Sequence, residues 1–597
     1  MRQVFNKNID QLRQLFTIGF GPHTIIIILA IGIGAMTGGV NILFRYILVL
    51  VKETILIGGQ NFLHIGDDIS SRFLLPLIPM SGAIILIIFA KIFPGEIYGY
   101  KFPDFLEKVN LSKGFITLKS ILLKMITPAI TIGSGGSAGV EGPIAYIGGG
   151  IGSLTAQLLG SSVKQRTLLI AAGAAGAISA TFNAPIAGVM FATEIILLGN
   201  YELMSFGAVV ISAGIATAIS RAYYGTNPTF TMPISDIKSI FETPLYIILG
   251  LCMGVLSVIY IKIFYWFKGY FEKANINEHV KPIIGAFMIG VIGIFFPHVM
   301  SDGYEYIVEA LNGNYLFFLL IILAFVKIFA TSITIGSGCS GGVFAPSLFI
   351  GAMAGGAFGV AVNYILPNFI TTPYISQPGT YAAIGMGAFL ASVTHAPLTG
   401  MFLLFELTGN YRVIIPVMLS SVTGVFMATR IFKDSIDTAE LSNRGINLHE
   451  GWEVSILGSL KVSDVMTKTF VTIHKNDTLN KVLDLVIMGK GLYFPVVDSH
   501  MEMIGIISMN DIKSVVLNDY IKQIVTAGDL CTEDVVVLTS IDNLNEALEK
   551  LSLMDLDEMP VVDFHEHKKV IGMIRRSDII STYNKEIMRR HSQESTF

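Results

Sequence analysis

Residues 130–148 read ITIGSGGSAGVEGPIAYIG, and residues 333–351 read ITIGSGCSGGVFAPSLFIG. The two stretches superimpose residue for residue and share most of their glycine, serine and proline positions. A second pair follows, because Ala-Pro at 184–185 precedes Glu194 as Ala-Pro at 396–397 precedes Glu406. The chain therefore contains an internal duplication, around which the remaining sequence is organised.

The repeated stretch has the composition of an anion site. Glycine and serine leave backbone N–H groups uncovered, and Pro143 and Pro346 suit the first turn of a helix. A glycine-rich loop that leads into a helix directs free N–H groups and the positive end of the helix dipole at one point. The alternative is close helix packing through small residues. The length, duplication and proline of the loop favour the anion site.

The composition excludes most other classes of protein. The chain has 597 residues, of which 52% are hydrophobic and only 14% are charged, as expected for a polytopic membrane protein. Cys252, Cys339 and Cys531 are scattered without the spacing of a metal site or a disulfide framework. We find no nucleophile–base set, so we do not expect an enzyme, a required cofactor, a metal site or a nucleic-acid partner.

The charged residues indicate the domain boundaries. Half of the 84 charged side chains lie in residues 434–597. We expect a membrane domain at 21–433 with repeat halves at about 74–220 and 244–433, many of its helices interrupted by Gly or Pro. The identity of the halves does not show whether they are parallel or inverted. The remaining expected parts are a cytoplasmic N-terminal segment at 1–20, which does not resemble a signal peptide, and a linker at 434–459.

The C-terminal part contains a second duplication. Residues 494–512 read FPVVDSHMEMIGIISMNDI, and residues 559–579 read MPVVDFHEHKKVIGMIRRSDI. Each stretch predicts a strand, a polar turn, a second strand and a helix, and two such units together can bury their apolar faces. Both resemble the CBS repeat. We expect a cytoplasmic α/β pair with one repeat at 460–520, the other at 526–584, and a tail at 585–597.

The membrane half resembles the CLC family of chloride channels and proton-coupled anion exchangers. The resemblance rests on GVEGP at 139–143, GVFAP at 342–346 and FELTGNY at 405–411. It implies a polytopic all-α fold built as an inverted repeat of tilted, broken helices, and a homodimer with one pore in each subunit. Glu141 matches the gating glutamate. The matching anion-binding positions are Gly139, Val140, Val343, Phe344 and Ala345.

Three positions depart from the family pattern. Tyr100 stands where the family has an anion-coordinating serine, and Asp437 stands where it has the tyrosine of the central site. Ile195 replaces the inner proton-transfer glutamate, so that coupling position is lost. Tolerated drift could explain all three. Alternatively, the Tyr100 phenol serves the anion, while Asp437 accepts its hydrogen bond, pairs with Lys101 or points into cytoplasmic water.

The motifs predict permeation of small anions, with chloride as the first candidate, gated by Glu141 and sensitive to pH or voltage. Because Ile195 cannot carry a proton, a channel or a weakly coupled transporter is favoured. A strict H⁺/Cl⁻ antiporter, or transport of fluoride or nitrate, is the alternative. A membrane-anchored nucleotide sensor is a remote one, since an anchor needs no ionisable residue at membrane depth.

The CBS-like repeats suggest an adenine nucleotide site. The resemblance implies a ribose-binding aspartate in a turn, and Ser508 and Asp511 fit that turn in the first repeat. The second repeat has Asp578 with Arg575 in place of the serine, and an arginine can bind phosphate through paired donors. ATP, ADP and AMP are the candidate ligands. A purely structural dimerisation module is the alternative.

Overall fold

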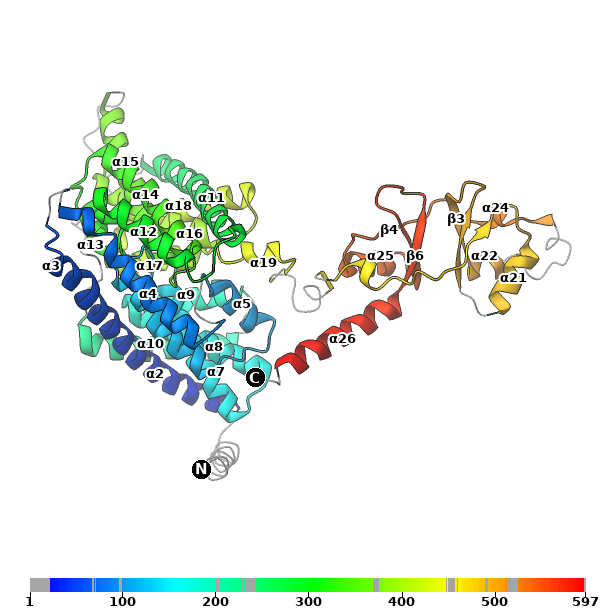
Figure 1. Cartoon of the computed structure of the whole chain (residues 1–597), viewed down its shortest axis with the longest axis horizontal. Helices are drawn as coiled ribbons and strands as arrows, with labels where there is room; N and C mark the ends of the chain where they lie inside the picture. The colour runs from blue at the N-terminus through cyan, green and yellow to red at the C-terminus, as the bar shows by residue number, and fades with distance from the viewer. Residues whose placement is uncertain are drawn as a thin grey trace. The chain divides into compact units, whose positions relative to one another are not determined.

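The computed structural model describes residues 22–594 apart from short gaps, so the predicted N-terminal segment at 1–20 lies outside the described residues. The gaps are 67–68, 70, 96–98, 200–202, 227–229, 231–241, 369–374, 447, 449–456, 459, 489–491, 514 and 516–523. The chain divides into two compact units, Met1–Glu440 and Leu441–Phe597. The first is helical and the second contains two small sheets (Figure 1).

The first unit is a series of apolar helices of unequal length. In chain order they are α2 (Pro22–Val51), α3 (Gly58–Phe62), α4 (Leu77–Ile92), α5 (Phe102–Asn110), α6 (Leu118–Gly133), α7 (Glu141–Leu159), α8 (Val163–Phe182), α9 (Pro185–Phe191), α10 (Leu203–Tyr224), α11 (Thr243–Lys273), α12 (Lys281–Phe295), α13 (Tyr304–Leu311), α14 (Phe317–Gly336), α15 (Phe344–Ile365), α16 (Pro378–Thr394), α17 (Pro397–Thr408), α18 (Ile414–Ile431) and α19 (Ala439–Asn443). Two π-helical segments, η1 (Lys52–Ile57) and η3 (Ala192–Ile196), continue α2 and α9. Short 3-10 turns are η2 (Ser71–Leu74), η5 (Pro297–Val299), η6 (Leu366–Asn368) and η7 (Tyr411–Val413).

The lengths of these helices suit a membrane. Within the described residues, seven helical stretches are long and apolar enough to cross a bilayer: Thr24–Phe62, Ser71–Ile92, Phe206–Tyr224, Thr243–Lys273, Phe317–Gly336, Phe344–Ile365 and Tyr411–Ile431. Others, such as Pro185–Ile196 and Pro397–Thr408, are apolar but shorter. Helices that end inside the protein leave backbone groups available for a buried site, which a full span does not.

The duplication is visible in the packing of the helices. α7 packs on α8 as α15 packs on α16, and α10 packs on α8 as α18 packs on α16. The glycine-rich loops of the two halves meet in an antiparallel bridge, in which the Gly139 and Gly342 N–H groups donate to each other's carbonyls at 2.8 and 2.7 Å. The contact is reciprocal, because each loop donates one backbone hydrogen bond to the other and accepts one from it.

Glycines outside the loops allow this close packing. A Cβ placed on Gly148 of α7 would lie 2.3 Å from the carbonyl oxygen of Gly173 on α8. The second half has the same contact, because a Cβ on Gly351 of α15 would lie 2.5 Å from the Gly385 oxygen of α16. Small residues thus pack α8 and α16, which are buried along most of their length, against the helices that follow the glycine-rich loops.

The second unit contains two copies of one small α/β arrangement. The first sheet, of order β1-β2-β3, is formed by Ile473–His474, Tyr493–Val497 and Met503–Ser508, and the second, of order β4-β5-β6, by Leu538–Thr539, Glu558–Val562 and Val570–Arg575. In each sheet the first pair is parallel and the second antiparallel. The helices are η8 (Val462–Asp464), α21 (Leu479–Ile487), α22 (Met509–Lys513), α24 (Ala527–Leu530), α25 (Leu544–Leu553) and α26 (Arg576–Glu594).

The two copies also exchange bridges. Thr467, which precedes β1, pairs with Met573 of β6, and Thr532, which precedes β4, pairs with Ile506 of β3. Each copy thereby extends the sheet of the other, so the two form one module around two apolar clusters.

Candidate functional site

Glu141, the first residue of α7, lies between the starts of two helices. Its side chain is fully buried, and Oε2 accepts a hydrogen bond of 3.2 Å from the N–H of Ala345 in the first turn of α15. The Tyr304 hydroxyl of α13 donates to Oε1. The carboxylate therefore occupies a place where the amide of one helix and the dipole of another favour a negative charge.

The loops leave just enough room for this carboxylate. A Cβ on Gly139 would lie 2.2 Å from Glu141 Oε2 and 3.0 Å from the Ala345 nitrogen, so a larger residue would displace the side chain. Val140, Val343 and Phe344 are buried around the same point. The structure thus brings together the five backbone positions that the sequence placed at an anion site, and it places Glu141 among them.

Tyr304 is a partner of Glu141 that the sequence did not reveal. It follows Gly303, whose positive φ of 80° turns the chain into α13, and its ring meets Phe230 edge-on at 5.6 Å. The preceding turn is held by the fully buried Lys327 of α14, whose Nζ donates to the carbonyls of Val299 and Ser301 at 3.0 Å each. The available signal was Lys327, an ionisable residue within an apolar helix.

Away from Glu141, in the loop before α5, Tyr100 donates a hydrogen bond to Asp437 Oδ1. This pair is called the inner end of the predicted anion path below. Lys101 pairs instead with Asp104 at 3.0 Å. Of the arrangements expected for Asp437, the structure therefore has the one with the tyrosine. Asp437 is 1% exposed, which rules out a side chain that points into water.

Aromatic contacts connect the two ends. The rings of Tyr100 and Phe102 lie 6.5 Å apart, those of Phe102 and Phe191 6.1 Å apart, and those of Phe191 and Phe344 5.5 Å apart. The chain of rings leads from Tyr100 to the start of α15, where Glu141 is bound. The Tyr100–Asp437 pair and the Glu141 carboxylate thus belong to one continuous buried region.

Comparison with known proteins identifies the family. The sequence profile described as "Voltage gated chloride channel" matches residues 81–429, and the profile described as "CBS domain" matches residues 462–518 and 527–585. The chain belongs to the CLC family. Its expected fold, a polytopic helical membrane domain of the CLC type with an α/β CBS pair, is confirmed.

Similar CLC proteins include channels and exchangers by name. The chloride channel protein CLC-f of Arabidopsis thaliana is 30% identical over 593 residues, which cover 86% of this chain and 74% of that protein. The H(+)/Cl(-) exchange transporter ClcA of Vibrio campbellii is 31% identical over 434 residues, or 70% of this chain and 90% of the relative.

Solved CLC structures share the fold. A slow cyanobacterial Cl⁻/H⁺ antiporter aligns with a TM-score of 0.63 at 24% identity, over 71% of this chain and 98% of its own. A eukaryotic CLC transporter aligns with a TM-score of 0.61 at 19% identity, over 93% and 97%.

Glu194 and Ile195 are neighbours in η3 of this CLC protein, but their side chains have different surroundings. Ile195 is a buried apolar residue of η3. Glu194 accepts from the N–H groups of Leu398 and Thr399 at 2.9 and 2.6 Å, at the start of α17. In return, Glu406 accepts from the N–H groups of residues 186 and 187 at the start of α9, at 3.1 and 2.8 Å. Both glutamates cap helices, as their repeated position suggests.

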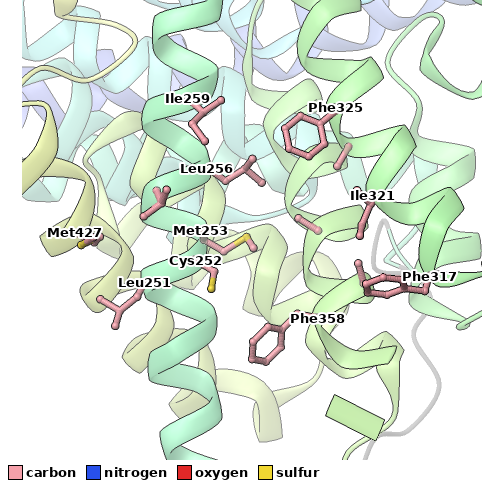
Figure 2. Close-up of a pocket in the computed structure, with 14 residues that line it drawn as sticks. Leu251, Cys252, Met253, Leu256, Ile259, Phe317, Ile321, Phe325, Phe358 and Met427 are labelled. Atoms are coloured by element: carbon pink, nitrogen blue, oxygen red, sulfur yellow. The ribbon is translucent and has the colours of Figure 1, made fainter. Parts of the chain in front are cut away.

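A large apolar groove lies apart from these groups. It has a volume of about 530 Å³ and is lined by α11, α14 and α15, with side chains such as Leu256, Ile259 and Phe325 (Figure 2). Its lining carries no charged side chain and is apolar apart from the thiol of Cys252. The residues predicted to bind an anion therefore lie in the packed region between the loops and not in this groove.

The CBS pair places its four predicted nucleotide-binding residues in equivalent turns. In the first repeat, the N–H and the hydroxyl of Ser508 both donate to Asp511 Oδ2 at 2.7 Å. In the second, Asp578 lies in the first turn of α26, and Arg575 Nε donates to Glu558 Oε1 at 3.1 Å. Arg575 is therefore already paired with a carboxylate, and a phosphate would have to compete for it.

Proposed function

We propose that this CLC protein carries a small anion, with chloride as the first candidate, through the region between the Tyr100–Asp437 pair and Glu141. The observation that supports this most directly is the carboxylate of Glu141 bound to the Ala345 N–H. A carboxylate in that place is an internal competitor for the transported anion. Gly139, Val140, Val343, Phe344 and Ala345 form the anion site once Glu141 leaves it.

Glu141 is the gate in this proposal. While it is ionised it fills the site and blocks the path, and when it is protonated or displaced an anion passes. Anion flux into liposomes that contain the purified protein should therefore rise as the pH falls. Glu141→Gln should remain active and lose the part of this pH dependence that comes from opening the gate. A mutant with the full wild-type pH response would refute the assignment of the gate.

The degree of proton coupling follows from Ile195, which cannot carry a proton between Glu141 and the cytoplasm. We place the protein among channels or weakly coupled transporters, with voltage or pH as the controlling variable. The alternative is strict H⁺/Cl⁻ antiport, in keeping with the names of several relatives. A chloride gradient across liposomes distinguishes the two, because only an antiporter would drive uphill proton movement in a fixed ratio.

The selectivity among anions depends on the Tyr100–Asp437 pair at the inner end of the path. Tyr100 supplies a phenolic hydroxyl that is already bound to Asp437, so the path offers a different set of donors from a serine and a tyrosine. Fluoride and nitrate are the alternatives to chloride. Competition among the three anions in the same flux assay ranks them.

The assembly we propose is a homodimer with one path in each subunit and with the CBS pair in the cytoplasm. ATP, ADP or AMP is the candidate ligand of Ser508, Asp511, Arg575 and Asp578. Calorimetric titration of the full-length protein with each nucleotide tests this site. No heat from any of them would leave the CBS pair as a structural module.

A further inference from the structure

Asp437 is a buried carboxyl group whose hydrogen bonding is incomplete. Its segment follows α18 and is anchored by the Ile436 N–H, which donates to the Val393 carbonyl at 3.0 Å. Oδ1 accepts from the Tyr100 hydroxyl, whereas Oδ2 has no hydrogen-bond partner in the part of the chain that the structure describes. An ionised carboxylate that is buried with one oxygen unpaired is costly, and a proton on that oxygen removes most of the cost.

The groups around Asp437 do not balance its charge. Tyr100 approaches it from the loop before α5, and Tyr260 interacts with it electrostatically from α11. Tyr265 of α11 binds the neighbouring carbonyl of Ile436 at 2.6 Å. All three are phenols, which carry no positive charge.

The nearby cations are engaged elsewhere. Lys101 forms its ion pair with Asp104, and Lys268 forms one with Glu440. Within the described residues, no lysine or arginine forms an ion pair with Asp437. An anion that arrived beside an ionised Asp437 would therefore meet a like charge with no cation to offset it.

We propose that Asp437 takes up a proton when an anion occupies the inner end of the path, so that the two bind there together. The proton comes from the aqueous phase and forms an O–H bond at Oδ2, without a bond broken in the protein. The carboxyl group then changes from a charge that repels the anion into a donor that can bind it.

Tyr260 supports this assignment independently. Its hydroxyl is also buried without a hydrogen-bond partner among the described residues. Its ring is fixed by Phe264 at 6.3 Å and by Phe389 at 6.1 Å. Its unpaired O–H is a hydrogen-bond donor, and a bare anion is a ligand that accepts such a bond.

This inference rests on the proposed anion path, and its test separates the two. We would measure chloride binding by calorimetry between pH 6 and pH 9 in the Glu141→Gln protein, which removes the titration of the gate. Binding should weaken by up to about tenfold per pH unit once Asp437 is ionised, because proton and anion binding are linked reciprocally. Buffers with different heats of ionisation should show uptake of up to one proton per chloride.

The comparison is with Glu141→Gln/Asp437→Asn, in which the inner group is always neutral. This double mutant should bind chloride with no dependence on pH and no proton uptake. Glu141→Gln/Glu272→Gln is the matched control, since it removes an exposed carboxylate of α11, leaves Lys101 and Lys268 in their ion pairs with Asp104 and Glu440, and should keep the slope. If the Asp437 variant fails to fold, Tyr100→Phe in the same background should move the transition to higher pH, because it removes a donor to the carboxylate.

The possible results are distinct. If Glu141→Gln binds and transports chloride with no dependence on pH, the role of Asp437 is refuted while the anion path stands. The same conclusion follows if the Asp437→Asn double mutant keeps the slope. If neither wild type nor Glu141→Gln binds or transports any small anion, the proposed function fails, and this inference fails with it.

Discussion

The hydrogen bond from Tyr304 to Glu141 should hold the gate in its closed position, and Tyr304→Phe removes it while keeping the ring. A hydrogen bond to a charged group contributes about 1.5–3 kcal/mol, which corresponds to a roughly 10- to 150-fold change in a two-state population. The Ala345 N–H still binds Oε2 in the mutant, so closure weakens but is not abolished. The ring contact with Phe230 needs no hydroxyl, so α13 should keep its place.

The assay is chloride flux from liposomes as a function of pH. We expect Tyr304→Phe to be faster than wild type at neutral pH. Its activation should begin at higher pH, because a carboxylate that has lost a donor is protonated more readily. The matched control is Tyr306→Phe, a tyrosine of the same helix whose ring lies against His298 at 4.6 Å.

A double mutant tests whether the effect of Tyr304→Phe acts through Glu141. In the Glu141→Gln background, Tyr304→Phe should change the flux much less than it does in wild type, because its effect acts through the carboxylate. Equal flux and an equal pH midpoint in Tyr304→Phe and wild type would refute the idea that this bond holds the gate. An undiminished effect in the Glu141→Gln background would refute the idea that Tyr304 acts through the Glu141 carboxylate.

Three further results should follow from other contacts. Lys327→Met leaves two buried carbonyls without their donor and should destabilise the protein by on the order of 3 kcal/mol. The loss should be seen as a lower Tm in detergent. Phe329→Leu on the same helix is the control and should change the Tm little. Glu194→Ala and Glu406→Ala should each cost about 1 kcal/mol and lower the Tm by similar amounts, because the two glutamates cap equivalent helices; a loss confined to one of them would contradict this equivalence. In the CBS pair, hydrogen bonds from the Thr526 hydroxyl and N–H hold the pKa of Asp529 below its usual range, so their stabilisation is present at neutral pH and is lost as the pH falls through that lowered pKa. The Tm difference between wild type and Thr526→Val should therefore shrink between pH 7 and about pH 3, and an equal difference at both would contradict the pairing.

The sequence could locate the glycine-rich loops because they occur in a duplicated stretch. Glu141 came from the resemblance of GVEGP at 139–143 to the CLC motif, since its counterpart in the second copy is Phe344. A repeated pattern distinguishes a constrained position from chance within a single chain, and the same reasoning found the two CBS repeats. The family resemblance also singled out Tyr100 and Asp437 as departures, but it left three arrangements open for Asp437. Local spacing does not determine which partner a side chain meets when that partner is more than 300 residues away.

Tyr304, Lys327 and Tyr260 could not be predicted in the same way. Tyr304 lies in a short helix whose contact with Glu141 depends on a turn, and that turn is held by Lys327 of another helix. Tyr260 is one aromatic residue among many in α11, a helix rich in them for reasons of membrane packing. These residues act through tertiary contacts, and the local sequence pattern does not show which distant residues come into contact in the fold.

The exchange of caps between Glu194 and Glu406 has a consequence for biosynthesis. When the ribosome has completed the first half, the amides at the start of α9 and the carboxylate of Glu194 have no counterpart, because their partners lie in a half still to be translated. The early half is therefore an unfinished intermediate whose polar groups must be shielded by water or by the insertion machinery. Assembly ends with a docking step that satisfies both halves at once, so two separately expressed halves should recover transport together and not alone.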